Sequence, residues 1–373
     1  MFDLKQFIAN LDTFVGFKTC VDINPIEFER ARDWIKTFYG ATNTEFIELE
    51  FEGYSSLLIK PAGSRRPQVL GDGHIEVVAG PEEQFKLVQR GKRLFGRGVA
   101  DMKTQCLMMM TVQRELIAQG NHNDFWILFS EDEEIGSGNG AKRVIEYLCS
   151  HELKPNIAFV PDGGPNFGYV EKEKGILRFT VSMPDQAAHA SRPFLGENAI
   201  EKMAGFYRLL QNRFPNPKSE KDWRTSMVMT SINGGEAENK VPERCVAGFD
   251  ARLTEHEVIG EVIESISEIV RPFGAEIVIR AADQATYYPK EKTVARRFID
   301  ILRRVSGQEP AILWTNGASN GRIYLEQDDS ISVLMSNPNV WGAHAEGESL
   351  EIASIKPYYD LVMATAQMSI SYP

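Results

Sequence analysis

Cysteine is scarce in this sequence, and no cysteine lies near another. The 373 residues include four, Cys20, Cys106, Cys149 and Cys245, and no two of them form a C-x-x-C pair. This spacing excludes a zinc knuckle and a dithiol redox motif, and the small number excludes a disulfide-stabilised scaffold. We expect four reduced thiols, most of them buried.

Long apolar runs and basic clusters are also missing. No segment approaches the 18 or more apolar residues of a membrane-spanning helix, and the first residues have neither the basic nor the apolar region of a secretory signal. The 52 Asp and Glu residues outnumber the 41 Lys and Arg residues, which gives a net charge of −11. Binding to nucleic acid through its phosphates is therefore disfavoured. The default expectation is a cytoplasmic protein whose partners include neither a membrane nor a nucleic acid.

Short apolar segments alternate with helical patterns in the first and last parts of the chain. The predicted strands there include residues 69–70, 125–129, 157–160 and 331–335. The predicted helices include residues 104–118, 141–150 and 293–305. Strands that are apolar throughout and that alternate with helices indicate an α/β fold with a largely buried sheet.

The middle third of the chain has a different pattern. Its predicted strands are 176–182, 226–232, 247–253 and 275–280, and its predicted helices are 198–214 and 257–270. This order is typical of an α+β sandwich of one sheet and two helices. We therefore expect one discontinuous domain, formed by residues 1–175 and 284–373, with a second domain of residues 176–283 inserted into it.

Residue types that bind metal ions follow each of the four apolar runs of the first domain. They are His74 and Glu76, the acidic run 131–134, Asp162, and His344. Asp101, in a glycine-rich turn, is a further candidate. In open α/β sheets functional groups collect beyond the carboxyl ends of the strands, so we expect these side chains to meet. Imidazoles with carboxylates suit zinc, cobalt or manganese, and one carboxylate can bridge two ions.

The histidines discriminate better than the carboxylates. An acidic run such as 131–134 is also typical of a solvated loop or of a helix N-terminus. His122, His151 and His256 lie in a polar loop or at helix ends, where structural or solvated histidines are common. His74 and His344 differ, because both follow predicted strands in glycine-rich segments.

Taken together, these segments resemble the motif set of the M20 metallopeptidase family. The matching segments, in order, are residues 73–78, 96–103, 132–136, 161–163 and 344–348. The inserted domain adds segments similar to those of the family's lid domain, at 188–193, 196–200 and 234–242. The family includes dipeptidases, tripeptidase-type aminopeptidases, glutamate carboxypeptidases, acetylornithine deacetylase and succinyl-diaminopimelate desuccinylase. The resemblance implies a zinc-peptidase-like catalytic domain with a mixed sheet, and an inserted α+β, ferredoxin-like domain for lid closure and dimerisation.

The resemblance also implies roles for single residues. Asp101 would bridge two divalent ions, most simply zinc, with cobalt or manganese as alternatives. His74 and Asp162 would complete one site, and Glu134 and His344 the other. Glu133 would be the general base that takes a proton from water and delivers it to the leaving nitrogen. A cis peptide bond after Asp101 is expected on the same ground.

In the inserted domain, His189 would donate to the oxyanion, as in relatives where this histidine often reaches across a homodimer interface. The alternative is a loop histidine that packs beside Pro193.

Asn239, Arg252 and Gly317 would contact the substrate. The arginine has an alternative interpretation too, namely an ion pair with Asp250 or Glu255.

Two positions depart from the family pattern. Glu76 stands where an aspartate usually orients the imidazole of the first ligand, and it is one methylene longer. Asn320 stands where an aspartate is common. Changes next to metal ligands can cost ~10–100-fold in metal affinity or activity. We therefore expect Glu76 to be one of the catalytic residues, and the sequence does not determine the effect of its greater length.

Asp162 indicates the substrate class, because Asp at this position accompanies aminopeptidases and dipeptidases in the family, whereas Glu accompanies carboxypeptidases and deacylases. The leading prediction is a binuclear metal-dependent hydrolase that cleaves dipeptides or short peptides with a free amino end. The first alternative is an N-acyl-amino-acid deacylase similar to acetylornithine deacetylase, acting on an acyl-amino acid. The second is a homologue that binds peptides without cleaving them.

Overall fold

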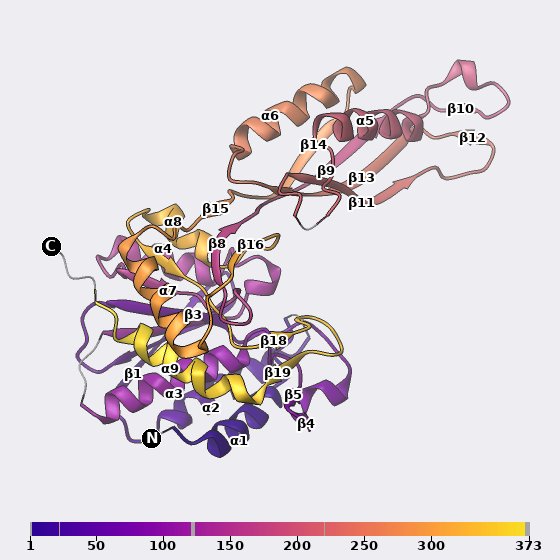
Figure 1. Ribbon diagram of the computed structural model, residues 1–373. Coiled ribbons are helices and arrows are strands. Elements are labelled where there is room, and N and C mark those ends of the chain that lie inside the picture. The colour runs from indigo at the N-terminus through magenta and orange to yellow at the C-terminus, as the bar shows by residue number, and fades with distance from the viewer. Residues whose placement is uncertain (1, 22, 121–123, 220, 370–373) are drawn as a thin grey trace. The chain divides into compact units, whose positions relative to one another are not determined.

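The computed structural model describes residues 2–21, 23–120, 124–219 and 221–369 (Figure 1). The chain divides into two compact units. The first comprises Met1–Glu171, Tyr288–Trp314 and Ser319–Pro373, and the second comprises Lys172–Tyr287 and Thr315–Ala318. The first unit is thus discontinuous in sequence, and each unit has its own hydrophobic core.

A six-stranded mixed sheet forms the centre of the first unit. Its strand order is β1-β2-β6-β3-β7-β17. The bounds are β1 Thr44–Phe51, β2 Tyr54–Pro61, β3 Val69–His74, β6 Phe125–Ser130, β7 Ile157–Phe159 and β17 Ser332–Leu334. Strands β3, β6, β7 and β17 are parallel, and β1 and β2 are antiparallel neighbours at one edge. The expected strands at 69, 125, 157 and 331 are therefore confirmed as neighbours in one sheet.

Helices cover this sheet in two groups. They are α1 Leu4–Val15, α2 Pro25–Tyr39, α3 Lys103–Ala118, α4 Ala141–Ser150, α7 Thr293–Ser306, α8 Gly321–Gln327 and α9 Ile352–Ala366. Helices α1, α3, α9 and α7 pack in succession, and α4 packs on α8. Across the described ranges, no helix combines the length and the apolar character that a membrane crossing needs.

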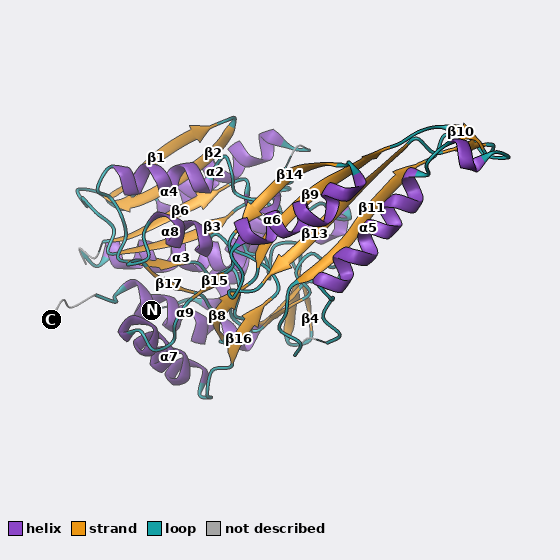
Figure 2. Ribbon diagram, turned by 90° about the horizontal axis from the view of Figure 1, so that it is seen from above, coloured by secondary structure: helices purple, strands orange, loops and turns teal. Residues whose placement is uncertain are grey.

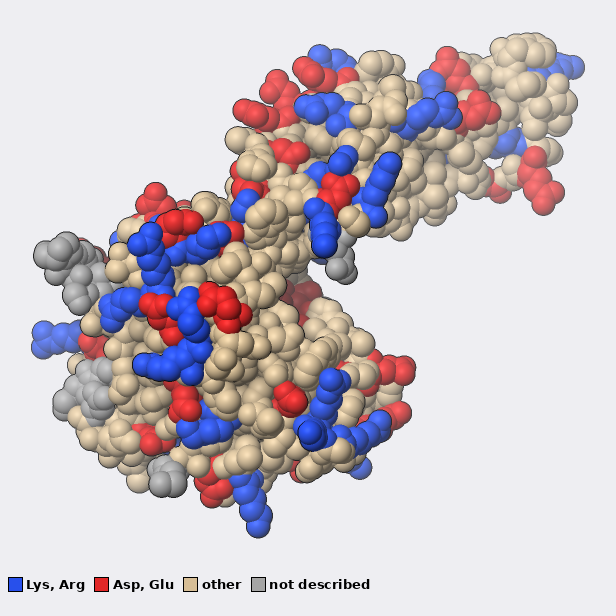
Figure 3. Space-filling view, viewed as in Figure 1, with Lys and Arg blue, Asp and Glu red and all other residues tan. Residues whose placement is uncertain are grey.

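Local sequence explains where several of these helices begin and end. The side chain of Asp3 caps α1 by accepting from the backbone N–H of Gln6, and Pro25 occupies the first turn of α2. Helix α7 ends at Gly307, whose φ of 71° suits glycine. On the surface of α7, Arg303 pairs with Asp300 and Glu309, and Figure 3 shows acidic and basic side chains interspersed over this unit.

Two glycines of β3 let α3 approach the sheet closely. A Cβ at Gly71 would lie 2.6 Å from the Met109 sulfur, and a Cβ at Gly73 would lie 2.8 Å from the Cys106 sulfur. Small residues are thus required on both sides of Asp72. The four cysteines all lie within the described residues and are free, and Cys20, Cys106 and Cys245 are buried, as expected.

The chain also contains two smaller sheets and several short 3₁₀ helices. A four-stranded antiparallel sheet has the order β18-β19-β5-β4, with β4 Val88–Arg90, β5 Arg93–Phe95, β18 Val340–Trp341 and β19 Ser349–Glu351. A three-stranded sheet has the order β15-β8-β16, with β8 Tyr169–Glu173, β15 Thr286–Tyr287 and β16 Ile312–Thr315. The 3₁₀ helices are η1 Glu82–Phe85, η2 Glu133–Ile135, η3 Pro193–Leu195 and η4 Arg271–Phe273. Pairing of β5 with β19 places the loop that carries His344 beside the turn that carries Asp101.

The second unit is an α+β sandwich. Its antiparallel sheet has the order β11-β13-β9-β14, with β9 Gly175–Pro184, β11 Ser226–Gly234, β13 Arg244–Leu253 and β14 Glu276–Asp283. Helices α5 Ala199–Arg213 and α6 Ile259–Val270 cover one face (Figure 2). A short pair of strands, β10 Ala188–His189 and β12 Lys240–Val241, extends from this sandwich. Alternate residues of β9 and β13 are buried, and Phe179 stacks on Phe249 beneath the helices.

The expected fold class, a mixed-sheet domain with an inserted α+β domain, is therefore correct. The roles expected of the second unit, lid closure and dimerisation, stay predictions.

Candidate metal centre

Five separate segments of the first unit bring imidazole and carboxylate groups together. His74 is the last residue of β3, Glu133 and Glu134 lie in η2 just after β6, and Asp162 follows β7. Because β3, β6 and β7 are parallel neighbours, their carboxyl ends meet at one edge of the sheet. Asp101 and His344 reach this edge from the turn before α3 and from the β18–β19 loop.

Asp101 lies between two imidazoles. Its Oδ1 atom is 2.9 Å from Nε2 of His74, and its Oδ2 atom is 3.0 Å from Nε2 of His344. Nε2 of His344 is also 3.0 Å from the carboxylate of Glu134. One carboxylate therefore uses its two oxygens toward two different histidines, which is the arrangement of a bridging ligand.

The donor atoms fit a metal ion. Two groups of three, His74 with Glu133 and Asp162 and His74 with Asp101 and Glu134, each place their ligand atoms within 4.8 Å of one another. Neutral imidazole nitrogen and carboxylate oxygen are suitable ligands for zinc and similar divalent ions. The structure thus brings all five expected ligands to one edge, and their individual assignments to an ion stay predictions.

Negative charge is concentrated here. Burial, together with the negative charges of Asp101 and Glu134, raises the pKa of Glu133 to about 7. Hydrogen bonds to Asp101 and Glu134 raise the pKa of His344 to about 10. Burial alone would lower the pKa of His74, but the negative charges of Glu76 and Asp101 hold it well above its usual value. Protons on these imidazoles and carboxylates thus offset part of the negative charge of the site. A divalent cation would offset more of it.

Glu76 does not contact the His74 ring as an orienting carboxylate would. The Oε2 atom of Glu76 is 3.7 Å from Nδ1 of His74. That nitrogen lies closer, at 3.1 Å, to the backbone carbonyl oxygen of Glu76. Its Oε1 atom instead accepts from the backbone N–H groups of Glu133 and Glu134. Burial raises the pKa of Glu76 to about 8. The longer side chain therefore reaches past the imidazole and holds the turn that carries the expected base.

A buried ion pair that the sequence analysis did not identify connects two ligand segments. Nη1 of Arg97 donates to Oε2 of Glu348 at 2.8 Å, and Oε1 of Glu348 accepts from the backbone N–H groups of Ala100 at 2.8 Å and Asp101 at 3.1 Å. Both side chains are nearly fully buried. Arg97 and Glu348 lie in the segments 96–103 and 344–348, which resemble family motifs. The sequence therefore contained a signal that could have identified this pair.

The backbone at two expected ligands is unusual. The peptide bond between Asp101 and Met102 is cis, as expected. His344 has a φ of 66°, in the left-handed region that side-chain-bearing residues adopt at a cost of ~1–3 kcal/mol. Such conformations persist only where the surrounding structure fixes them.

In the second unit, His189 and Asn239 lie together. Residues Ala188 and His189 of β10 pair with Val241 and Lys240 of β12, and the N–H of Ala190 donates to the Asn239 carbonyl oxygen at 2.8 Å. The imidazole of His189 is exposed, and its Nδ1 atom lies 2.7 Å from the Ser191 hydroxyl.

Arg252 and Gly317 lie elsewhere in that unit. Arg252 is opposite Ile176 at the far end of β13 from Arg244, and its Nε donates to Asp250 at 2.8 Å, which is the expected alternative ion pair. Gly317 is exposed, and its carbonyl oxygen accepts from the Thr315 hydroxyl at 3.2 Å.

Two further histidines among the described residues, His151 and His256, lie outside this cluster. His151 follows α4 and its Nδ1 lies 2.8 Å from the Tyr147 carbonyl oxygen, as a structural role predicts. His256 is exposed beside Glu255. His122 lies outside the described residues.

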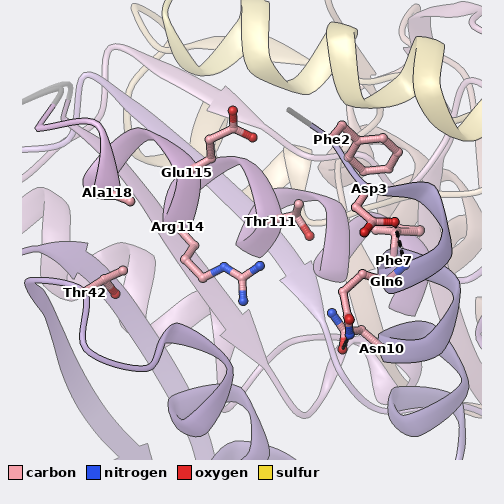
Figure 4. A pocket seen from close by; sticks show the side chains of 10 residues that line it. All are labelled: Phe2, Asp3, Gln6, Phe7, Asn10, Thr42, Thr111, Arg114, Glu115 and Ala118. Atoms are coloured by element: carbon pink, nitrogen blue, oxygen red, sulfur yellow. Dashed lines mark hydrogen bonds between the residues drawn. The ribbon is translucent and has the colours of Figure 1, made fainter.

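A pocket of about 360 Å³ in the first unit has different chemistry (Figure 4). Helix α1 and the C-terminal half of α3 line it, and Arg114 projects into it. Arg114 donates to the Phe38 carbonyl oxygen and stacks on that ring, Thr111 donates to the Leu107 carbonyl oxygen, and Glu115 accepts from Tyr359. These polar groups hold neighbouring elements together rather than forming a set of metal ligands.

A buried mixed sheet with imidazoles and a shared carboxylate at its carboxyl edge is the structure of a metal-dependent hydrolase. Residues 71–368 match the family described as Peptidase family M20/M25/M40, and the chain belongs to that family. It is thus an M20-type peptidase or amidohydrolase that acts on peptides or acyl-amino acids.

Relatives and solved structures agree with this membership. The chain is 22% identical over 377 residues to succinyl-diaminopimelate desuccinylase of Rickettsia felis, covering 95% of this chain and 98% of that protein. It superposes on aminopeptidase PepT of Bacillus cereus with a TM-score of 0.80 at 14% identity, over 98% of both chains. It superposes on an M20 family metallo-carboxypeptidase of Sulfolobus solfataricus with a TM-score of 0.79 at 17% identity, over 97% of this chain and 98% of the other. At these identities the superpositions establish the fold alone.

Proposed function

We propose that this protein hydrolyses dipeptides or short peptides with a free amino end, using two divalent ions held by His74, Asp101, Glu134, Asp162 and His344. The observation that carries the proposal is the position of Asp101, which directs one oxygen toward each of two histidines. Zinc is the expected ion. Ions bound here would supply a Lewis acid and lower the pKa of a bound water to roughly 7.

The protein's own proton carrier would be Glu133. Its carboxyl group belongs to the donor group with His74 and Asp162, so it lies within reach of a water molecule between them. Glu133 would take a proton from the attacking water and give it to the leaving nitrogen, while the carbonyl carbon gains the hydroxyl group. The products are a carboxylic acid and an amine. A carboxylate placed beside the attacking water can serve both steps, first as the base and then as the acid.

The support for a substrate with a free amino end is Asp162, which is the residue type that the resemblance associates with aminopeptidases and dipeptidases. Arg252 would then bind the substrate's carboxylate, because Asp250 is shared between Arg252 and Arg178 and the group keeps a net positive charge.

The second candidate is removal of an acyl group from an acyl-amino acid. The name of the Rickettsia felis relative favours it, since that protein is a desuccinylase. It would use the same base and ligands, so the two candidates differ only in how the acyl side of the substrate is bound.

A matched substrate series distinguishes the two. Dipeptides, N-acetyl amino acids and N-succinyl amino acids that share one leaving amino acid are incubated with the full chain and zinc or manganese, and the released amino acid is measured by mass spectrometry. Release from the dipeptides alone would support the proposal, and release from the acyl compounds alone would replace it with the second candidate.

The Glu133→Gln variant is the control, because any release that it retains comes from another source. If the wild-type chain carries its ions and still releases nothing from any member of the series, the third interpretation, a peptide-binding homologue, would stand.

A further inference from the structure

The residues at the start of α8 connect the two segments that carry His74 and Glu133. The Nδ2 atom of Asn320 donates to Oδ1 of Asp72 at 3.3 Å, and its Oδ1 atom accepts from the Ser137 hydroxyl. Asp72 lies two residues before His74 in β3, and Ser137 lies two residues after Ile135, the last residue of η2. One amide group thus links the strand that carries the first expected ligand to the turn that carries the expected base.

All three side chains of this link are buried. Asp72 and Ser137 have no exposed surface, and Asn320 is 2% exposed. The second oxygen of Asp72 accepts from the Tyr324 hydroxyl at 2.7 Å. Each buried hydrogen-bond donor or acceptor needs a partner. The side chain at position 320 must therefore donate to Asp72 and accept from Ser137. An amide provides both functions, whereas an ionised carboxylate provides an acceptor alone.

The turn itself is held in an unusual conformation. Ser137 has a φ of 60°, in the left-handed region, and its N–H donates to the Asp132 carbonyl oxygen at 2.7 Å. Arg322 adds a second connection from α8, because its Nη2 donates to the Gly136 carbonyl oxygen at 3.1 Å. A non-glycine residue keeps such a φ only where its surroundings fix it. The start of α8 provides part of that fixation.

We propose that Asn320 is a positioning residue, which fixes the relative placement of His74 and of Glu133 and Glu134 through Asp72 and Ser137. The inference rests on the proposed function for what those three residues do. It also explains the departure at position 320: opposite Asp72, the aspartate common in relatives would place two buried carboxyl groups side by side without a donor between them.

Exchanging the two residues tests this link. In Asp72→Asn/Asn320→Asp, Ser137 can donate to the new aspartate, the new asparagine can donate to it as well, and Tyr324 can donate to the new amide oxygen. All three hydrogen bonds are therefore kept, and only the bond between positions 72 and 320 reverses its direction. Asn320→Asp alone keeps the Ser137 bond but loses the donor toward Asp72. Asn212→Asp, an exposed position on α5, is the control for an added negative charge.

The main readout is independent of turnover. Zinc is titrated into ion-free protein and the heat of binding gives its affinity, and kcat and KM are measured separately on the substrate that the wild-type chain cleaves best. We expect Asn320→Asp to lose ~10–100-fold in zinc affinity and in kcat, with KM nearly unchanged. The exchanged double variant should return to within about threefold of the wild type, and Asn212→Asp should match the wild type.

Two results would overturn the inference. One is wild-type zinc affinity and kcat in Asn320→Asp, and the other is a double variant that loses as much as Asn320→Asp alone, or more. If Asn320→Asp does not fold, the double variant decides: a folded protein with near wild-type zinc affinity supports the link, and an unfolded one rejects it. Failure of the proposed function is a separate result, because it shows in the wild-type chain, which would then bind no zinc or cleave no dipeptide.

Discussion

At the candidate metal centre of the first unit, Asp101 lies between the buried His74 and the exposed His344, and the buried Glu76 accepts from two backbone N–H groups. In the second unit, His189 and Asn239 are exposed and are held by a pair of two-residue strands. The first arrangement fixes donor atoms before anything binds, which is what ion binding and proton transfer require. The second leaves polar groups available for a molecule outside the unit. The contrast predicts that changes in the first unit reduce ion binding and turnover together, whereas changes in the second unit reduce turnover alone.

Removing the ions should have the largest effect. After dialysis against a chelator, we expect no measurable turnover and a lower unfolding temperature, because an ion that binds only the folded state stabilises it by about 2.7 kcal/mol at 100 times its Kd. Zinc should restore both properties. Full turnover by protein shown to be free of ions would contradict the expectation that turnover depends on ions bound by the first unit.

Glu133→Gln should follow, with a loss of ~10²–10⁴-fold in kcat, since it removes the proton acceptor and keeps the shape. Ion content, measured by elemental analysis, should not change. Glu346→Gln, an exposed position in the His344 loop, is the matched control and should keep its activity. Retained turnover in Glu133→Gln would remove this residue from the proposed mechanism.

His189→Ala tests the second unit. We expect kcat to fall ~10²–10³-fold, the loss typical of a missing oxyanion donor, with ion content and unfolding temperature unchanged. His256→Ala, an exposed histidine of the same unit, should behave as the wild type. If His189→Ala lost its ions, ion binding would depend on the second unit. That result would contradict the contrast between the two units.

Glu76→Asp should cost ~10–100-fold in zinc affinity and kcat, because the shorter side chain no longer reaches the N–H groups of Glu133 and Glu134. Glu76→Gln keeps the reach and an acceptor oxygen, so its loss should be smaller. The reverse order, with Gln worse than Asp, would mean that the charge of Glu76 matters more than its contacts with the turn.

The smallest effect is expected at Arg252. Arg252→Ala should raise KM about tenfold, equivalent to 1.4 kcal/mol, with kcat nearly unchanged. Arg178→Ala removes the other arginine that contacts Asp250 and serves as the matched variant, which we expect to change KM less. Equal effects of the two would assign Arg252 to the ion pair rather than to the substrate.

Much of the sheet could be predicted from sequence, because β6 and β7 are buried along their whole length and are apolar except for Ser130, and because buried β3 begins with the apolar pair Val69 and Leu70. The β1–β2 hairpin was not predicted. Its outer strand is half-exposed and alternates glutamate with apolar residues, so it lacks a continuous apolar run. Helix α9 was missed as well, since apolar residues lie on most of its sides and Pro357 interrupts the pattern.

The ligand types at His74, Glu134 and Asp162 could be predicted, because each lies at or after the end of a strand that the sheet topology brings to one edge. The contacts of Glu76 could not, since the direction of its side chain depends on the η2 turn, 57 residues later in the chain. The pair of Arg97 and Glu348, separated by 251 residues, and the link through Asn320 likewise depend on tertiary packing.

The pairing of Arg97 with Glu348 has a consequence for how the protein is made. The turn that carries Asp101 is fixed by a side chain that the ribosome adds 247 residues after it. At ~5–20 residues per second, that delay is roughly 12 to 50 seconds, during which His74, Asp101 and Glu133 exist without their last partners. The proposed binding of an ion by His344 would therefore be a late event in biosynthesis, and a chain released before its final thirty or so residues would lack a complete site even with its inserted unit fully formed.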